Sequence, residues 1–204
     1  PDFNWRLFGE AGTLNFTSTV PIAVSGFRTL VNENQEFLIS STPVEDVLQV
    51  NNKPVVIPEW VDGAGWNSDL VLVNTTENNL DGEVRFLDPS GAPAELGIGD
   101  GSTGASVLEY IIPPRSSQRI TTSGTSARTD FPFATRGTEQ LRTPGTNFTQ
   151  ATGYAVAESS APVTGLQILE YRKDNVTHSQ TGLLASPPVQ IGRVFVEVTN
   201  TVQT

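Results

Sequence analysis

The spacing of apolar residues constrains this chain most. Nowhere along its 204 residues do apolar side chains recur at the three- and four-residue spacing of an amphipathic helix. Short runs rich in β-branched and aromatic residues instead alternate with clusters of Gly, Pro, Asn and Asp, which is typical of all-β domains. We therefore predict strands at Trp5–Phe8, Thr13–Ser18, Ile22–Val31, Glu36–Ser40, Val55–Trp60, Leu70–Asn74, Gly82–Leu87, Val107–Ile112, Gln118–Thr122, Gly153–Glu158, Thr164–Tyr171, Val176–Leu184 and Arg193–Thr199.

Several gaps between these runs carry turn chemistry. Asp81-Gly82 predicts a tight hairpin turn, and Asp88-Pro89-Ser90-Gly91 predicts a type I turn with Pro second and Gly fourth. Pro113-Pro114 must end the run through Ile112, because proline cannot donate to a strand ladder. The long polar segments Gly91–Ser106 and Ser123–Gln150 are predicted to be strand-poor loops, of the kind that are functional, packed as Ω-loops or mobile.

The chain also contains an internal echo. Gly12–Ile22 aligns with Gly153–Val163 at a shift of 141 residues, and the same shift pairs Asn34 with Asn175. A repeat of this length indicates a duplicated supersecondary unit. We therefore divide the chain into an N-terminal half-repeat (1–53), a complete β-sandwich (54–190) and a C-terminal donated or linking strand (191–204).

A half-sandwich of about four strands cannot shield its apolar face, and its edge carries unpaired backbone groups. It must therefore dock on residues 54–190 of its own chain or be completed by strands from another chain. Our hypothesis is strand exchange between subunits, with either Arg193–Thr199 or the N-terminal strands Trp5–Phe8 and Thr13–Ser18 as the donor. Arg193–Val198 alternates valine with other residues, a pattern that suits a strand donated into a neighbour's sheet. The residues expected at such a subunit interface are Trp5, Leu7, Phe8, Leu14, Phe16, Arg193, Val194, Phe195, Val196 and Val198.

Composition narrows the partners and the environment. A formal charge of −10 repels nucleic-acid phosphates and anionic lipid, and no apolar run approaches the length that spans a bilayer. The absence of Cys and the single histidine, His178, argue against thiolate-bound metals and histidine-rich sites, so we expect no cofactor and no metal. Low charge, no oxidisable sulfur and a first residue, Pro1, that is not Met lead us to expect a processed extracellular or cell-surface protein.

Two segments resemble a known group of proteins. Val55–Asn74 runs from an apolar-Pro strand through an acidic Gly-rich turn into a strand that ends in Asn, and Ile111–Ser117 holds an apolar pair followed by Pro-Pro. Together with Pro21–Pro43, these segments resemble the bacterial extracellular immunoglobulin-like β-sandwich repeats of large secreted and surface proteins, over about two thirds of the chain. The resemblance implies an immunoglobulin-like sandwich and carries over no catalytic residues.

No constellation of catalytic residues emerges from the sequence. His178 follows an expected hairpin turn and is interpreted as an exposed residue rather than a base. Glu59, Asp62, Asp69, Glu158 and Glu170 supply carboxylates, but their spacing defines no acid–base pair, so we predict no enzymatic activity. Trp60 and Trp66 flank a turn and would stack on sugar rings if both faced solvent. The Asn-x-Thr rule marks Asn15, Asn74, Asn147 and Asn175 as glycan acceptors.

The sequence hypothesis is thus an all-β, non-enzymatic extracellular structural protein. It would be made of an immunoglobulin-like sandwich and an N-terminal half-sandwich, and completed by strands from other copies in a fimbria-like, head-to-tail filament. Its partner is itself, with glycans as the other expected ligands. The alternative is a cell-surface adhesin or carbohydrate-binding β-sandwich module that uses Trp60, Trp66 and the Ser123–Gln150 loop.

Overall fold

The computed structural model describes residue 14 and residues 16–46, 54–94, 106–122, 138–142 and 150–186. Every helix or strand assigned in this part of the chain is a β-strand, so the all-β prediction is confirmed. No helix of a length and apolarity that could cross a membrane occurs among the described residues.

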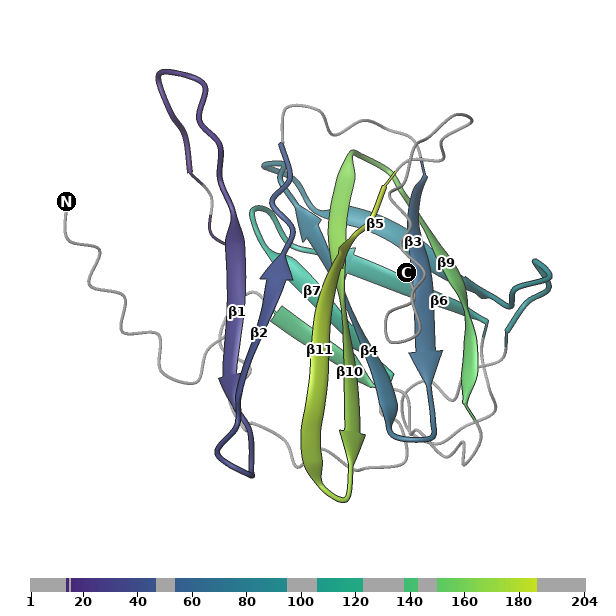
Figure 1. The fold of residues 1–204 in the computed structure, drawn as a ribbon. Coiled ribbons are helices and arrows are strands. Elements are labelled where there is room, and N and C mark those ends of the chain that lie inside the picture. The colour runs from purple at the N-terminus through teal and green to yellow at the C-terminus, as the bar shows by residue number, and fades with distance from the viewer. Residues whose placement is uncertain are drawn as a thin grey trace.

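Two sheets form the body of the protein, and most of their neighbouring strands are antiparallel (Figure 1). The four-stranded sheet contains, in spatial order, β3 (Val55–Asp62), β9 (Ala151–Ser159), β5 (Leu80–Leu87) and β6 (Val107–Ile112). The five-stranded sheet contains β11 (Val176–Leu184), β10 (Val163–Lys173), β4 (Trp66–Asn74), β7 (Ser117–Thr121) and β8 (Thr138–Arg142). The β7–β8 pair is parallel. The chain changes sheet at β3–β4, β4–β5, β6–β7, β8–β9 and β9–β10, which gives the body its sandwich-like character.

The core lies between these two sheets. Alternate residues of each strand point inward, as period-two patterning requires, so apolar side chains of both sheets meet. Trp60 is 2% exposed and meets Phe86 edge to face, with ring centroids 6.3 Å apart. The other large side chains that are fully buried and apolar are Ile57, Leu70, Leu72, Leu80, Val84, Ile112, Ile120 and Val163.

Two of the three turn predictions are confirmed. The Gly91 N–H donates to the Asp88 carbonyl at 3.0 Å, as in a type I turn, and Gly91 has a φ of 87°. β6 ends at Ile112, and the chain passes through Pro113-Pro114 to β7 in the other sheet. The predicted hairpin turn at Asp81-Gly82 is wrong, because both residues lie inside β5. Gly82 is required there for space: a Cβ would sit 2.3 Å from the Glu158 carbonyl oxygen.

The ends of the predicted strands and one predicted loop differ from the structure. β8 lies within the strand-poor segment Ser123–Gln150 and was not predicted, because its pairing with β7 depends on a partner distant in sequence. The described residues of Thr13–Ser18 are not in a strand, and the strand expected at Ile22–Val31 begins only at Gly26. The predicted strands Trp5–Phe8 and Arg193–Thr199 lie outside the described residues.

A separate two-stranded sheet, β1 (Gly26–Val31) with β2 (Phe37–Thr42), lies beside the sandwich (Figure 1). Its strands pair antiparallel, from Gly26 opposite Thr42 to Val31 opposite Phe37. β2 runs alongside β11, and β1 lies on the side of β2 away from β11. We call this pair the N-terminal hairpin. The candidate site lies on this hairpin and on the part of the sandwich that it contacts, which we call its seat.

Candidate assembly surface

The turn of the N-terminal hairpin is built around Asn32, which is 3% exposed. Its Oδ1 accepts hydrogen bonds from the backbone N–H groups of Asn34 (3.0 Å) and Glu36 (2.8 Å). Its Nδ2 donates to the Glu36 carboxylate at 2.7 Å. Asparagine suits this position because its short side chain hydrogen-bonds backbone groups a few residues on and so closes the turn.

This turn is joined to the β10–β11 turn of the sandwich by a cluster that we call the clasp: Asn32, Glu33, Arg172 and Thr177. The Asn32 Nδ2 donates to the Thr177 carbonyl at 3.0 Å, and the Thr177 N–H donates to Glu33 Oε2 at 2.9 Å. Arg172 donates to Glu33 Oε1 at 2.8 Å. The Thr177 N–H and the Arg172 guanidinium hold the pKa of Glu33 below its usual range.

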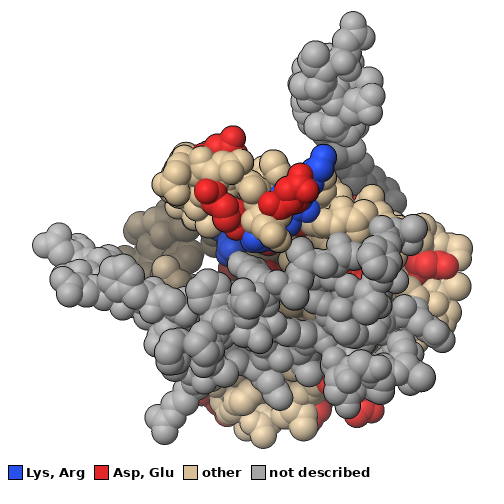
Figure 2. All heavy atoms as spheres, turned by 90° about the horizontal axis from the view of Figure 1, so that it is seen from below, with Lys and Arg blue, Asp and Glu red and all other residues tan. Residues whose placement is uncertain are grey.

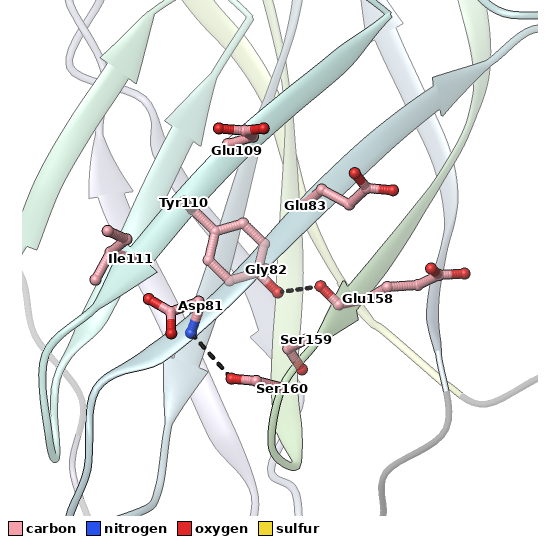
Figure 3. Close-up of a pocket in the computed structure, with 9 residues that line it drawn as sticks. All are labelled: Asp81, Gly82, Glu83, Glu109, Tyr110, Ile111, Glu158, Ser159 and Ser160. Atoms are coloured by element: carbon pink, nitrogen blue, oxygen red, sulfur yellow. Dashed lines mark hydrogen bonds between the residues drawn. The ribbon is translucent and has the colours of Figure 1, made fainter.

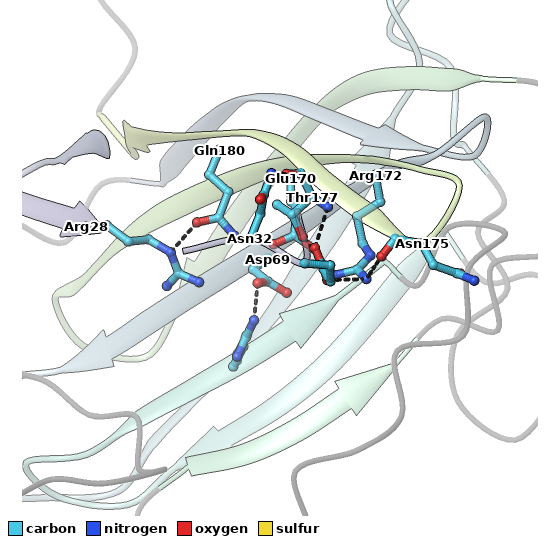
Figure 4. A network of polar contacts seen from close by, with 10 residues as sticks. Arg28, Asn32, Asp69, Glu170, Arg172, Asn175, Thr177 and Gln180 are labelled. Atoms are coloured by element: carbon cyan, nitrogen blue, oxygen red, sulfur yellow. Dashed lines mark hydrogen bonds and ion pairs between the residues drawn. The ribbon is translucent and has the colours of Figure 1, made fainter. Parts of the chain in front are cut away.

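A second set of polar contacts extends from the clasp along the seat of the hairpin (Figure 4). Arg28 of β1 donates to Gln180 Oε1 of β11 at 2.7 Å, and Gln180 Nε2 donates to the Glu170 carboxylate of β10. Glu170 is 2% exposed and lies 4.0 Å from Arg172, so this row of contacts leads back to the clasp. These hydrogen bonds and ion pairs join the hairpin to the sandwich at specific positions.

The clasp was not predicted from the sequence, although the sequence carries a signal for it. The 141-residue shift places Glu33 over Asp174 and Asn34 over Asn175, which are the two turns that meet in the fold. β1–β2 and β10–β11 are thus two hairpins at corresponding positions of the echo, and they lie beside each other.

The two faces of the N-terminal hairpin differ sharply. The inward face, which includes Arg28, Leu30 and Leu38, is half-buried. The outward face exposes its large apolar side chains: Phe27 by 68%, Val31 by 56%, Phe37 by 64% and Ile39 by 61%. Four such side chains on one small sheet form a contiguous apolar patch of the kind that marks an interaction surface.

The segment before β1 is apolar and exposed as well. Its large apolar residues stand at even positions, the period of a strand, although none of the described ones lies in a strand. They are Leu14 (67% exposed), Phe16 (48%), Val20 (62%), Ile22 (56%) and Val24 (42%). Leu14 and Phe16, expected at the subunit interface, are therefore accessible to a partner.

The charges at this end of the molecule are mixed in sign. Figure 2 looks along the sheets at the end where the turns of the N-terminal hairpin and of β10–β11 lie in Figure 1. On the part of this face that the structure describes, Lys and Arg side chains lie beside Asp and Glu. Such a surface has no single-sign field that would draw a highly charged partner to it.

A shallow depression on the outer side of the four-stranded sheet is acidic (Figure 3). Glu83 of β5 lies directly opposite both Glu109 of β6 and Glu158 of β9, so three carboxylates form a row. Arg85 lies 3.2 Å from Glu83 and 2.5 Å from Glu158 and offsets part of this charge. No group of three His, Cys, Asp or Glu in the described parts of the chain is arranged to hold a metal ion, and we assign no chemistry to the depression.

The two tryptophans proposed for sugar stacking have different surroundings. The prediction is wrong for Trp60: it is buried, and its Nε1 donates to the carbonyls of Leu87 and Tyr154, both at 3.1 Å. Trp66 is half-buried and stacks obliquely on Tyr171, with ring centroids 4.9 Å apart. Tyr171 in turn lies 6.0 Å from the exposed His178.

The four predicted glycan acceptors differ in their accessibility and in whether the structure describes them. Asn74 cannot carry a glycan in the folded chain: it is 1% exposed, and its Nδ2 donates to the carbonyls of Asn78, Ile112 and Pro113. Asn175 is exposed at the β10–β11 turn with a φ of 64°, so its amide is accessible. Asn15 and Asn147 lie outside the described residues.

The remaining interface residues predicted from the sequence also lie outside the described residues. They are Trp5, Leu7, Phe8, Arg193, Val194, Phe195, Val196 and Val198. Their role at a subunit interface stays a prediction.

Comparison with known proteins returned little. No family model and no curated protein matches the chain. A solved structure, "Crystal Structure of Thermotoga maritima 1070", aligns over 68% of this chain and 96% of its own, with 14% identity and a TM-score of 0.41. We draw nothing from a likeness of this degree.

Proposed function

We propose that this protein is a non-enzymatic, extracellular structural subunit that polymerises head to tail by β-strand complementation. The observation that carries the proposal is the apolar outward face of the N-terminal hairpin, with Phe27, Val31, Phe37 and Ile39 each more than half exposed. A two-stranded sheet is marginal in water, and its open edge and bare face are a template for another chain.

The form of the contact follows from the sequence and the sheet together. The hairpin needs a strand at its edge, and Arg193–Val198 has the alternation of a strand with one apolar side. A contact between the two ends of different copies is heterologous, so it builds an open fibre unless its rotation closes a ring. The completed unit would be an immunoglobulin-like sandwich, in line with the resemblance of Val55–Asn74 to such repeats.

The test is the assembly state of the intact chain and of a chain that lacks residues 191–204. We expect sedimentation velocity and negative-stain microscopy to show filaments or a ladder of oligomers for the intact chain. We expect soluble monomers for the truncated chain, with the same thermal transition of the sandwich. A monomeric intact chain at high concentration overturns the polymer, and unchanged filaments after truncation overturn strand donation.

A second function, carbohydrate binding by a cell-surface module, is favoured by one observation. Trp66 and Tyr171 form a half-exposed aromatic pair, which is the kind of surface that stacks on sugar rings. Quenching of tryptophan fluorescence on a glycan panel tests it, with Trp66→Ala as the variant. A saturable response that Trp66→Ala abolishes supports this second function, and no response to any glycan rules it out for that panel.

A further inference from the structure

The N-terminal hairpin has one edge that no described residue pairs. β2 lies between β1 and the sandwich, and among the described residues β1 forms a strand ladder with β2 alone (Figure 1). The open edge of β1 borders both faces of the hairpin. A strand added there would continue the apolar outward face beside Phe27 and Val31, and the inward face beside Arg28 and Leu30.

We propose that this edge receives residues 193–198 of a second copy, antiparallel to β1, with Glu197 opposite Arg28. The inference rests on the polymer proposed above and specifies its joint. In this register Phe195 lies opposite Leu30 on the inward face. On the outward face, Val194, Val196 and Val198 lie opposite Val31, Thr29 and Phe27.

Other registers match less well. A slip of one residue turns every side chain of the donated strand to the opposite face, which sets the valines on the polar side. A slip of two residues places a charge, Arg193 or Glu197, opposite the apolar Leu30. A parallel strand that keeps Glu197 opposite Arg28 moves Phe195 to Gly26 and brings Asn200 beside Val31. Among these registers, the antiparallel one with Glu197 opposite Arg28 pairs the opposite charges and keeps Phe195 and the three valines opposite Leu30, Val31, Thr29 and Phe27.

The geometry favours a second copy over the chain's own end. β11 runs along the hairpin from its turn toward its open end. Thr177, at the start of β11, lies at the hairpin turn, and Gly182 lies close to Thr42 at the open end. Ser186 lies farther on in the same direction, where it pairs with Val56. To reach the register above, the chain would return the length of β1, about 20 Å, and cross β2 and β1, about 15 Å more sideways. The seven steps from Ser186 to Arg193 span at most about 25 Å. A straight path from Ser186 to the open edge of β1 needs this whole length and would pass through the hairpin, so residues 193–198 of the same chain cannot reach this register around it.

Disulfide trapping tests the joint, because the chain has no cysteine of its own. Two variants with different tags, Thr29→Cys and Val196→Cys, are mixed, assembled and mildly oxidised. Residues directly opposite in a ladder meet the distance for a disulfide, whereas diagonal neighbours do not. We expect a mixed disulfide-linked dimer from this pair, and only the background of random collision when Val194→Cys replaces Val196→Cys.

The outcomes separate this inference from the polymer proposal. If filaments form but Thr29→Cys links no better to Val196→Cys than to Val194→Cys, the joint is wrong and the polymer stands. If the double variant Thr29→Cys/Val196→Cys closes on itself in dilute solution, the occupant is the chain's own end and the inference fails. If no assembly forms and no link appears, both proposals fail.

A charge reversal gives a second readout. Arg28→Glu or Glu197→Arg alone places like charges opposite each other, and we expect either to weaken association about two- to fivefold per joint. The two variants together should restore it. Rescue by Glu197→Arg cannot come from the contact of Arg28 with Gln180, since that contact stays broken. Association that the pair of variants fails to restore contradicts the register.

Discussion

Replacing Asn32 by alanine should release the N-terminal hairpin while the sandwich stays folded. Asn32 is buried and its side chain makes four hydrogen bonds, three that close its own turn and one to the Thr177 carbonyl. At about 1 kcal/mol net for each, and with the freed turn groups partly rehydrated, the loss is about 2–3 kcal/mol of hairpin stability. This loss of about 2–3 kcal/mol includes no contribution from the sandwich core, because the Asn32 side chain hydrogen-bonds the sandwich at the β10–β11 turn.

Amide hydrogen exchange measures this loss strand by strand. A decrease of 2–3 kcal/mol in local opening energy corresponds to about 30- to 150-fold faster exchange. We expect this acceleration for the amides of β1 and β2, with little change for β4 and β10. Asn34→Ala is the matched control, since Asn34 is exposed in the same turn and its side chain should contribute little.

Two results would refute this reasoning. Equal acceleration in the hairpin and in β4 would mean that the two parts unfold as one cooperative unit. Unchanged exchange in the hairpin would mean that the clasp does not hold it.

Further predictions concern the core and two carboxylates. Trp60→Phe should lower the free energy of unfolding by about 2–4 kcal/mol, because it removes the indole hydrogen bonds to two part-buried carbonyls and opens a cavity in the core; urea denaturation measures it. The pKa of Glu33 is lowered in the folded chain, so its carboxylate stabilises the docked hairpin above about pH 4.5, and this stability is lost as the pH falls through the lowered pKa. Hydrogen exchange of the β1 amides should therefore become faster in acid. In the Glu33→Gln variant these amides should exchange fast at every pH. Burial raises the pKa of Glu45 to about 7, so the folded state binds the proton of this carboxyl more tightly than the unfolded state does. The free energy of unfolding should therefore fall as the pH rises from about 4.5 to 7. Thermal melts of Glu45→Gln should lack this pH dependence, and a pH dependence that persists in the variant would contradict the assignment to Glu45.

The sandwich strands were predictable because apolar and polar residues alternate along them and turn residues mark their ends. Val176–Leu184 and Val107–Ile112 match β11 and β6 at both ends, since their alternation is bounded by clear turns and by Pro113-Pro114. β8 was not predictable, because its pairing with β7 depends on a contact distant in sequence. Asp81-Gly82 misled us because a glycine required for close packing looks the same in sequence as one required for a turn.

The candidate site was predictable in outline and not in detail. The echo and the apolar N-terminal segment predict a half-repeat whose apolar face needs a cover, and the structure exposes Phe27 and Phe37 in this part of the chain. The clasp was missed because Glu33 and Arg172 are far apart in sequence and each resembles an ordinary surface charge. Asn74 and Trp60 were misplaced for a related reason: a motif records residue types, whereas burial depends on the neighbouring sheet.

The most direct test of the central claim is the hydrogen exchange of β1 as a function of protein concentration. If a second copy covers the hairpin, protection of the β1 amides should rise with concentration while that of β4 stays constant, in step with the oligomers seen by sedimentation. Protection of β1 that is independent of concentration, in a chain that stays monomeric, would contradict the proposal that other copies complete this sheet.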